Sequence, residues 1–294
     1  TIFNGHLFVG EQLLSDSGMR DHPLTPMTDA NLVRVMQAQT KRRVGLVNYA
    51  TVSKGADAIK AAFQNLQDQG YGVAVVDAIS NTDLMAMGAA LAGMPLVTAG
   101  SGVAIGLPQN WRATGQLAPS DHADQLPPPS GYQAVISGSC SVATNQQVAV
   151  WRDAGLPALA VDPLGLANGT TTVDAAADWA RQHLPKGPVL VYATAAPEAV
   201  REIQAQLGVA AAGALVESAL SRIAVSLIEN GVRQLVVAGG ETSGAVVQAL
   251  AVARMAIGPQ IDPGVPWTCV NAAAVGDEIV HVALKSGNFG TPDF

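Results

Sequence analysis

The feature that most constrains the fold of this chain is the regular alternation of strand-like and helix-like segments along its 294 residues. Short apolar runs typical of buried strands alternate with longer segments whose apolar residues recur at helical spacing. Such alternation favours parallel strands joined by right-handed helical crossovers. The sequence therefore predicts an α/β protein with mainly parallel sheets flanked by helices.

The first part of the chain carries few strand signals. Strands are predicted at residues 44–49, 73–77 and 96–99, and helices at 54–69 and 82–92. Asp29 is predicted to cap a short helix with Leu32, Val35 and Met36 on one face. Three parallel strands form a small sheet with poorly protected edges. We therefore expect that an N-terminal part of the first domain is absent from the chain.

The second part carries enough signals for a complete domain. Strands are predicted at 134–137, 158–161, 188–193 and 234–238, and β-like runs at 267–270 and 279–284. Helices are predicted at 142–153 and 174–183, over a long stretch ending near 230, and from 240 to about 251. The proline-rich stretch 105–131 indicates a connection between domains. We expect an incomplete domain over 1–115 and a second domain over 116–294.

Composition excludes several classes of protein. Hydrophobic residues make up 49% of the chain and charged residues 13%, which excludes a disordered chain. The net charge of −7 and the lack of a basic stripe argue against a nucleic-acid partner. Cys140 and Cys269 form no disulfide or zinc pattern, so a reducing cytoplasm is expected. No apolar run of about 20 residues predicts a membrane span.

Glycine-bearing loops follow three of the predicted strands, where open α/β sheets bind ligands. In the first loop, 137–141, hydroxyls and backbone N–H groups before a helix could bind an anion through Ser139 and Ser141. The alternative is that Ser141 simply caps the next helix. The third loop, 285–290, combines Lys285 with Gly287 and could close over a nucleotide, or form an ordinary turn.

The second loop contains Gly239, Gly240, Glu241 and Thr242 between a strand and a helix. Paired glycines allow a phosphate to approach the backbone closely, although they are also common turn residues. Glu241 could hold a metal-bound water or a ribose hydroxyl, and Thr242 could bind a phosphate or cap the helix. All three loops belong to the second domain, so together they predict one phosphate-binding site.

Other functional motifs are missing from the sequence. It contains no GxxxxGK[ST], no HExxH and no GxSxG, which excludes a P-loop enzyme, a zincin and an α/β-hydrolase. Gly100-Ser101-Gly102 is the nearest approach to a dinucleotide fingerprint, but it lacks the later glycine. Asp77 and Asp162 lie near predicted strand ends, where an aspartate could be an acid, a base or a turn residue.

Taken in order along the chain, seven short motifs resemble the four-carbon acid sugar kinase family, and within it the 3-oxo-tetronate kinases. They cover residues 5–10, 22–27, 100–102, 137–141, 239–243, 262–267 and 285–290. Each motif alone is weak, but their order and joint presence are specific. One departure is large: members of the family begin with a further stretch of roughly a hundred residues that has no counterpart here.

The resemblance implies a non-P-loop kinase with two domains, the first for a sugar acid and the second for ATP. It implies that ATP is bound by Ser141, with Ser139, Gly239, Gly240, Glu241, Thr242 and Gly287, and that Mg²⁺ accompanies it. It places Gly100, Ser101 and Gly102 on the substrate side. The implied reaction transfers a phosphoryl group to the C4 hydroxyl of 3-oxo-tetronate. No residue of the chain is assigned as catalytic or as a metal ligand.

Alternatives remain open at this point. D-erythronate and D-threonate are alternative substrates, because the selecting residues are expected mostly in the stretch that has no counterpart here. A non-catalytic module that binds ATP or a sugar acid, and an NAD-dependent oxidoreductase, are the competing functions. A homodimer is expected only because two-fold assemblies are common.

Overall fold

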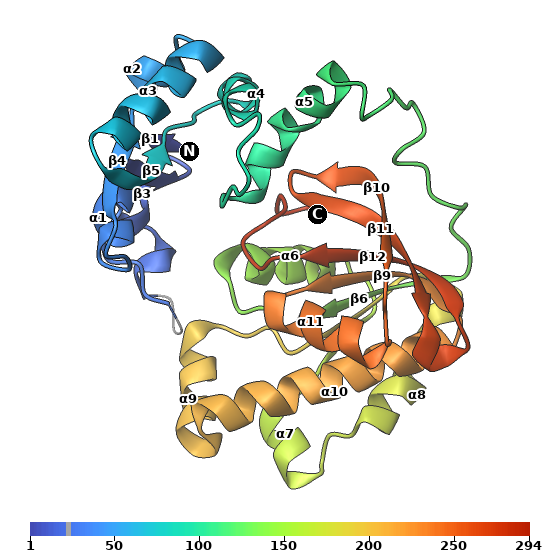
Figure 1. The fold of residues 1–294 in the computed structure, drawn as a ribbon. Coiled ribbons are helices and arrows are strands. Elements are labelled where there is room, and N and C mark those ends of the chain that lie inside the picture. Colours follow the sequence, from blue (N-terminus) through green and yellow to red (C-terminus); the bar gives the residue numbers. More distant parts are fainter. Residues whose placement is uncertain (22–24) are drawn as a thin grey trace. The chain divides into compact units, whose positions relative to one another are not determined.

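The computed structural model describes residues 1–21 and 25–294, which form two compact units, Thr1–Ser120 and Asp121–Phe294 (Figure 1). His22, Pro23 and Leu24, which open the predicted motif 22–27, lie outside the described residues. Parallel strands with flanking helices occur in both units, which confirms the predicted α/β class.

The first unit contains two small sheets. The strands β4 (Arg43–Val47) and β5 (Tyr71–Val76) pair in parallel, and β1 (Ile2–Phe3), β2 (His6–Val9) and β3 (Gln12–Leu13) form an antiparallel meander. The α-helices of this unit are α1 (Leu32–Gln37), α2 (Tyr49–Val52), α3 (Ala56–Asp68), α4 (Asn81–Ala90) and α5 (Pro108–Ala113). Short 3₁₀ helices lie at Leu14–Asp16, Gly18–Asp21 and Ser101–Gly106.

The helices of the first unit begin and end where their sequences provide caps. Ser80 and Asp83 form a capping box at the start of α4, in which each side chain accepts a backbone N–H of the other residue. Gly70, just after α3, has φ 78°, a conformation that glycine adopts without steric cost. Ile59 of α3 is fully buried against Val47 and Val52, and these residues form the small core of the unit.

Two expectations for the first unit are wrong. Residues 96–99 form no strand, because Leu96 is 78% exposed and the chain instead continues into the 3₁₀ helix Ser101–Gly106. This short helix packs so closely on α4 that a Cβ on Gly106 would collide with the backbone of α4 at Leu84. The predicted strand therefore lacks a partner, and its place is taken by packing between a helix and a 3₁₀ helix.

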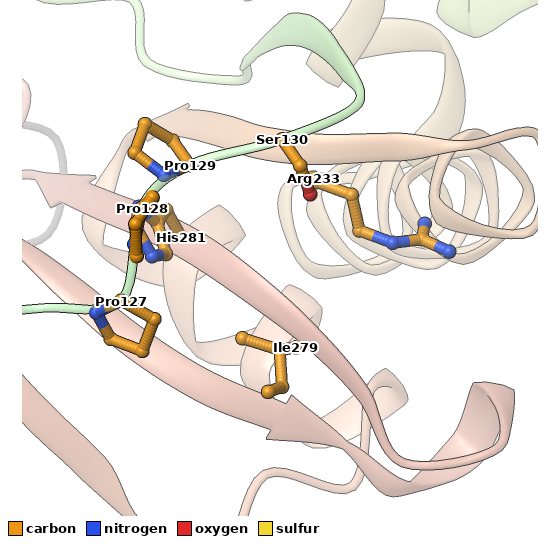
Figure 2. Close-up of a pocket in the computed structure, with 7 residues that line it drawn as sticks. All are labelled: Pro127, Pro128, Pro129, Ser130, Arg233, Ile279 and His281. Atoms are coloured by element: carbon orange, nitrogen blue, oxygen red, sulfur yellow. The ribbon is translucent and has the colours of Figure 1, made fainter.

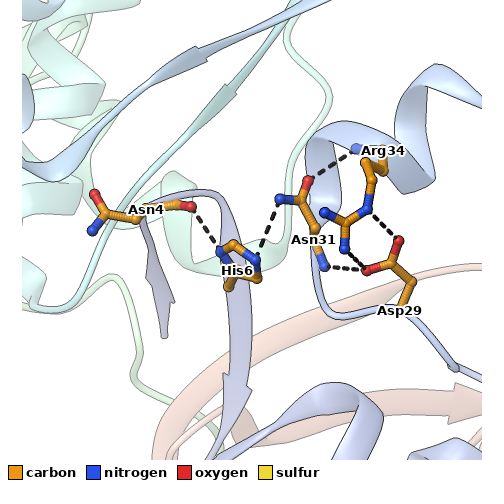
Figure 3. Close-up of polar contacts among 5 residues, drawn as sticks. All are labelled: Asn4, His6, Asp29, Asn31 and Arg34. Carbon is orange, nitrogen blue, oxygen red and sulfur yellow. Dashed lines mark hydrogen bonds and ion pairs between the residues drawn. The ribbon is translucent and has the colours of Figure 1, made fainter.

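The cap of α1 is Asn31, whose Oδ1 accepts the N–H of Arg34, and not Asp29 as predicted (Figure 3). Asp29 lies two residues earlier, where it accepts the N–H of Asn31 and pairs with the Arg34 guanidinium at 2.7 Å. These contacts, the Arg34 bond first, lower the pKa of Asp29 to about 2. Asn31 also contacts His6 at 3.3 Å, so this histidine belongs to a structural network.

The second unit is built on one seven-stranded mixed sheet in the order β10-β11-β12-β9-β6-β8-β7. The strands β12, β9, β6, β8 and β7 are mutually parallel, and β10, β11 and β12 are antiparallel. Their bounds are β6 (Tyr132–Ser137), β7 (Ala158–Ala160), β8 (Val189–Tyr192), β9 (Val232–Ala238), β10 (Met255–Asp262), β11 (Val265–Ala272) and β12 (Glu278–Lys285). No strand was predicted from the sequence at the position of β10.

Helices cover this sheet and complete the core of the second unit. They are α6 (Val142–Asp153), α7 (Pro163–Asn168), α8 (Val173–His183), α9 (Pro197–Leu207), α10 (Val209–Glu229) and α11 (Gly240–Ala249), with short 3₁₀ helices at Leu184–Lys186 and Ala273–Val275. The core consists of strand residues such as Ile136 and Leu235 packed against Leu220, Ile223 and Leu227 of α10. This cluster holds the parallel strands β6 and β9 in place, so their carboxyl ends form a fixed edge.

The helix α10 is long and apolar enough to cross a membrane by length and composition alone, with a mean hydropathy of 1.5. This finding differs from the expectation that no such segment exists. The helix α10 runs along the sheet of the second unit (Figure 1). Its apolar stripe is used in the core, because Leu220, Ile223 and Leu227 are buried there with residues of the strands. Its composition is therefore explained by packing on both the sheet and α11.

Candidate functional site

Three glycine-bearing loops meet at the carboxyl edge of the sheet in the second unit. They follow β6, β9 and β12, which are direct neighbours in the order β12-β9-β6. The last residues of these strands, Ser137, Ala238 and Lys285, lie in register across the sheet. The three loops, which the sequence predicts to form one site, lie together in the structure.

The first loop connects β6 to α6 and ends at Ser141, the N-cap of α6. The Oγ of Ser141 accepts the N–H of Thr144 at 3.2 Å, as a capping serine does. The same hydroxyl donates to the carbonyl oxygen of Gly287 at 2.5 Å, which joins the first loop to the third. Ser139 accepts the N–H of Ser141 and lies against Gly287. Capping is therefore only part of what Ser141 does.

The second loop connects β9 to α11 and depends on the conformational freedom of glycine. Gly239 has φ 123°, a backbone conformation that other residues rarely adopt, and its N–H donates to the carbonyl oxygen of Lys285 at 2.9 Å. Gly240 is exposed, and no other residue has an atom within 4 Å of the position that a Cβ on Gly240 would occupy. The backbone at Gly240 is thus open to close approach by a ligand.

Thr242 and Glu241 lie in the first turn of α11 and differ in exposure. Thr242 is buried, and its Oγ1 lies where a Cβ on Gly138 would collide with it, so this glycine allows the first and second loops to touch. Glu241 is exposed beside it. Among the described residues, no group of three or more His, Cys, Asp or Glu side chains could hold a metal ion.

The third loop follows β12 and is held against α6 through its carbonyl oxygens. Gly287 O accepts from Ser141 Oγ and from Thr144 Oγ1, the latter at 2.8 Å. A Cβ on Gly287 would collide with Ser139 Oγ, so this contact requires glycine. The side-chain amide of Gln147 donates to the carbonyl oxygens of Phe289 and Thr291. The loop is therefore fixed by side chains from the neighbouring helix.

Lys285 opens the third loop, as the sequence indicated, but was not among the residues expected to bind ATP. Its side chain is 1% exposed, and burial lowers its pKa to about 8, while the charge of Asp262 acts in the opposite direction. Thr144 and Gln147 were missed as well. A lysine before a Ser-Gly pair is visible in the sequence, but its burial depends on the packing of α6 over the end of β12.

The arrangement is suited to binding a polyanion. The N-termini of α6 and α11 both lie at this edge, and each presents backbone N–H groups and the positive end of a helix dipole. The hydroxyl of Ser139 and the open backbone of Gly240 add neutral donors. In such a site binding is governed by positioning and charge stabilisation.

The other predicted functional residues lie elsewhere. Gly100, Ser101 and Gly102 belong to the first unit, where Gly100 precedes a 3₁₀ helix instead of ending a strand. Asp77 is fully buried, and its carboxylate accepts the N–H groups of Asn4, Gly5 and Tyr49. Asp162 caps α7. Both aspartates thus have structural roles in the conformation described.

Two cavities of the second unit lie apart from the glycine loops. One, of about 140 Å³, is bounded by Pro127, Pro128, Pro129, Ser130, Arg233, Ile279 and His281 (Figure 2). The other, of about 460 Å³, shares the three prolines and His281. Among the described residues, His281 Nε2 is buried with no hydrogen-bond partner. His281 precedes Lys285 by four positions on β12, roughly 13 Å along the strand, so the cavity is separate from the loops.

Comparison with known protein families divides the chain into two matches. Residues 1–107 match the family model described as a sugar-binding N-terminal domain, and residues 134–294 match that of a nucleotide-binding C-terminal domain. The second match contains all three glycine loops. Both free cysteines, Cys140 and Cys269, lie within it as well.

Similar curated proteins share one name. The 3-oxo-tetronate kinases of Burkholderia multivorans and Pseudomonas fluorescens are 54% and 53% identical to this chain over 294 residues. These alignments cover 100% of this chain and 67% of each relative.

Solved structures with the same fold include two proteins at 42% identity. One is from Haemophilus influenzae and has a TM-score of 0.64. The match covers 100% of this chain and 69% of the Haemophilus influenzae chain. The other, from Salmonella typhimurium LT2, carries the provisional name of a tRNA synthase, has a TM-score of 0.76 and is matched over 68% of its length.

Proposed function

Since the chain belongs to the four-carbon acid sugar kinase family, we propose that it is an ATP-dependent kinase that phosphorylates the C4 hydroxyl of 3-oxo-tetronate. The observation that carries the proposal is the meeting of three glycine loops at the ends of β6, β9 and β12. A kinase must hold a triphosphate in a fixed position, and backbone N–H groups with helix N-termini can do so.

In the proposed site, ATP is held by Ser139, Ser141, Gly239, Gly240, Glu241, Thr242 and Gly287. The open backbone at Gly240 and the loop geometry at Gly239 fit close approach by a phosphate. Mg²⁺ is proposed to travel with ATP, because this ion commonly keeps its waters and binds through phosphates and one or two carboxylates. Glu241 is the exposed carboxylate of the loop and would take that role through a water.

The sugar acid is proposed to bind in the first unit, with Gly100, Ser101 and Gly102 on the substrate side. The match of residues 1–107 to a sugar-binding domain supports this assignment. The names of the relatives favour 3-oxo-tetronate over D-erythronate and D-threonate. The proposed setting is the bacterial cytoplasm, and the proposed assembly is a homodimer.

A phosphorylation assay tests the function directly. The chain would be incubated with Mg-ATP and each of the three four-carbon acids, and ADP release would be measured alongside the phosphorylated product. We expect turnover with 3-oxo-tetronate, with one ADP released for each molecule of phosphorylated product.

Calorimetric titration with Mg-ATP, with NAD as control, accompanies the assay. ATP binding without turnover on any acid would contradict the kinase proposal for this chain and favour a nucleotide-binding module. Binding of NAD in place of ATP would contradict the nucleotide assignment itself. Turnover with D-erythronate or D-threonate alone would correct the substrate and leave the reaction class unchanged.

A further inference from the structure

Lys285 occupies an unusual position, because it is among the largest fully buried side chains of the chain. It is the last residue of β12, and its Nζ lies near four oxygen atoms. Nζ is 3.1 Å from Thr144 Oγ1 and 3.0 Å from the carbonyl oxygen of Phe289. The carbonyl oxygens of Ser286 and Gly287 each lie at 3.3 Å. Three of these partners belong to the loop that follows the lysine.

These partners make the contacts depend on the charge of the lysine. An ammonium has three N–H donors and no acceptor, so it is complementary to a shell of oxygens. A neutral amine has one donor fewer and a lone pair. Because the Thr144 hydroxyl already donates to Gly287 O, that lone pair would face oxygen atoms. Deprotonation is therefore expected to release the carbonyl oxygens that the ammonium holds in place.

Groups from two elements act on the ammonium. The helix α6 contributes the Thr144 hydroxyl, and the last residue of β10, Asp262, has a negative charge that favours the protonated form. Burial acts more strongly in the other direction, and the pKa of Lys285 falls to about 8. At neutral pH the side chain is thus still mostly charged, but it loses its charge over a pH range in which most lysines keep theirs.

Burial also restricts how Lys285 can take part in binding. A side chain that is 1% exposed does not reach a ligand in this conformation, so any effect passes through the loop. In a trans peptide the C=O and N–H groups point in opposite directions. The carbonyl of Ser286 points at the ammonium, and the N–H of Gly287 in the same peptide therefore points away from it.

We propose that Lys285 is the positioning residue of the third loop: its ammonium gathers the carbonyl oxygens of Ser286, Gly287 and Phe289, and so turns the amide of Gly287 toward the nucleotide phosphates. This inference rests on the proposed nucleotide site and deepens it. It adds a residue that acts without contacting the ligand, and it makes nucleotide affinity depend on pH.

The expected pH dependence follows from linkage. If ATP binds the form with a protonated Lys285, its dissociation constant should be constant below the pKa of this lysine and should rise above it. The limiting rise is about tenfold per pH unit, for one proton taken up on binding. Phosphate groups titrate near pH 6, so the range from pH 7.5 to 9.5 reports on the protein.

The test compares the wild-type chain with Lys285→Met, which removes the charge at similar length, and with Lys186→Met as the matched control. Lys186 is the other lysine of the second unit and is exposed in the 3₁₀ helix before β8, away from the loops. Mg-ATP affinity would be measured by calorimetry across this pH range. Amide hydrogen exchange of residues 286–291, without ligand, would be measured with residues 265–272 of β11 as the internal reference.

We expect Lys285→Met to weaken Mg-ATP binding at pH 7.5 by more than tenfold and to abolish its pH dependence. Exchange in 286–291 should become more than tenfold faster relative to β11, and Lys186→Met should match the wild type in both measurements. If Lys285→Met does not fold, the wild type alone decides: its dissociation constant for Mg-ATP should rise above pH 8, toward tenfold per pH unit, and a constant value from pH 7.5 to 9.5 would overturn the positioning role.

The two measurements separate failure of this inference from failure of the proposed function. Unchanged exchange together with an unchanged affinity profile in Lys285→Met would overturn the positioning role while ATP binding stands. Faster loop exchange in a chain that binds no ATP would support the positioning role and overturn the nucleotide site. No ATP binding and no change in exchange would overturn both.

Discussion

Asp77 in the first unit and Lys285 in the second are buried ionisable groups of opposite sign in equivalent places. Each lies at the carboxyl end of a parallel strand, Asp77 directly after β5 and Lys285 at the end of β12. Their exposed fractions are 0% and 1%. Asp77 accepts three backbone N–H groups, and Lys285 donates to three backbone carbonyl oxygens. Each is satisfied mainly by the backbone and not by an opposite charge.

The two groups differ in where their partners come from. Asp77 joins segments that are 28 and 72 positions away, at Tyr49 and Gly5, so it ties the N-terminal meander to the parallel strands. The carbonyl partners of Lys285 lie within the next four residues. A buried ion with distant partners stabilises the fold, whereas one with local partners shapes a loop. Changes at the two positions should therefore have different effects.

The largest expected effect is that of Asp77→Ala. The substitution leaves one buried and two partly buried N–H groups without their partner, and a fully buried group in that state costs about 1–3 kcal/mol. We expect the first unit to lose on the order of 4 kcal/mol of unfolding free energy, while the second unit is unaffected. Hydrogen exchange of β4 and β9 under mild denaturant would report on each unit separately.

Glu11→Ala provides the control for Asp77→Ala, because Glu11 is an exposed acid in the same unit. It should change stability by less than about 0.5 kcal/mol. Equal loss of protection in β4 and β9 in the Asp77 variant would contradict the view that Asp77 stabilises only its own unit.

The second prediction concerns the stability of the second unit at alkaline pH. The pKa of Lys285 is lowered in the folded state, so between pH 8 and pH 10.5 the unfolded chain binds a proton that the folded chain does not. Stability therefore rises with pH in this window, by on the order of 3 kcal/mol in full, and does not change below it through this group.

Comparison of variants isolates that contribution from the other titrating groups. In urea unfolding from pH 7 to 10, the stability of the wild type relative to Lys285→Met should rise with pH. The wild type relative to Lys186→Met should show no trend. If the stability difference between the wild type and Lys285→Met does not change with pH, the ammonium of Lys285 is better solvated than its burial indicates. The contrast with Asp77 would then lose its basis.

Much of the second unit could be predicted from local patterns. The helix predicted at 142–153 was found as α6 with the same bounds, because its cap Ser141 and the following Gly155 both mark the ends in sequence. The three loops were placed in one site because they follow strands of one predicted sheet. That inference needed only the rule that parallel strands end at a common edge.

The predictions from sequence were wrong or incomplete where tertiary contacts determine the local structure. The run at 96–99 has the composition of a strand, but the structure gives it no neighbouring strand, and the chain packs Gly106 against Gly88 of α4 instead. Asp29 and Asn31 could not be told apart as the cap of α1, because Asp and Asn have about equal preference for the N-cap position. Lys285 was recognised in the third loop, but its burial could not be predicted, because it depends on side chains such as Thr144, 141 positions away.

The third and smallest effect tests whether the loops on the Lys285 side bind nucleotide. Gly240 and Gly100 form a matched pair, because neither has any atom within 4 Å of its missing Cβ and neither has a positive φ. A Cβ therefore meets no atom at either position, and both glycines are exposed. Gly240→Phe should place a ring over the open backbone and weaken Mg-ATP binding by more than tenfold, or about 1.4 kcal/mol.

Gly100→Phe should leave Mg-ATP binding unchanged and raise the KM for the sugar acid instead, because Gly100 lies in the unit proposed to bind that substrate. Calorimetry with Mg-ATP and steady-state kinetics with 3-oxo-tetronate would separate the two effects, and circular dichroism would check that both variants are folded. If Gly240→Phe binds Mg-ATP as tightly as the wild type, the phosphates lie away from α11. The site would then have to be sought among the other groups of this edge, on the side of Ser139 and Gly287, where Lys285 would still shape the loop.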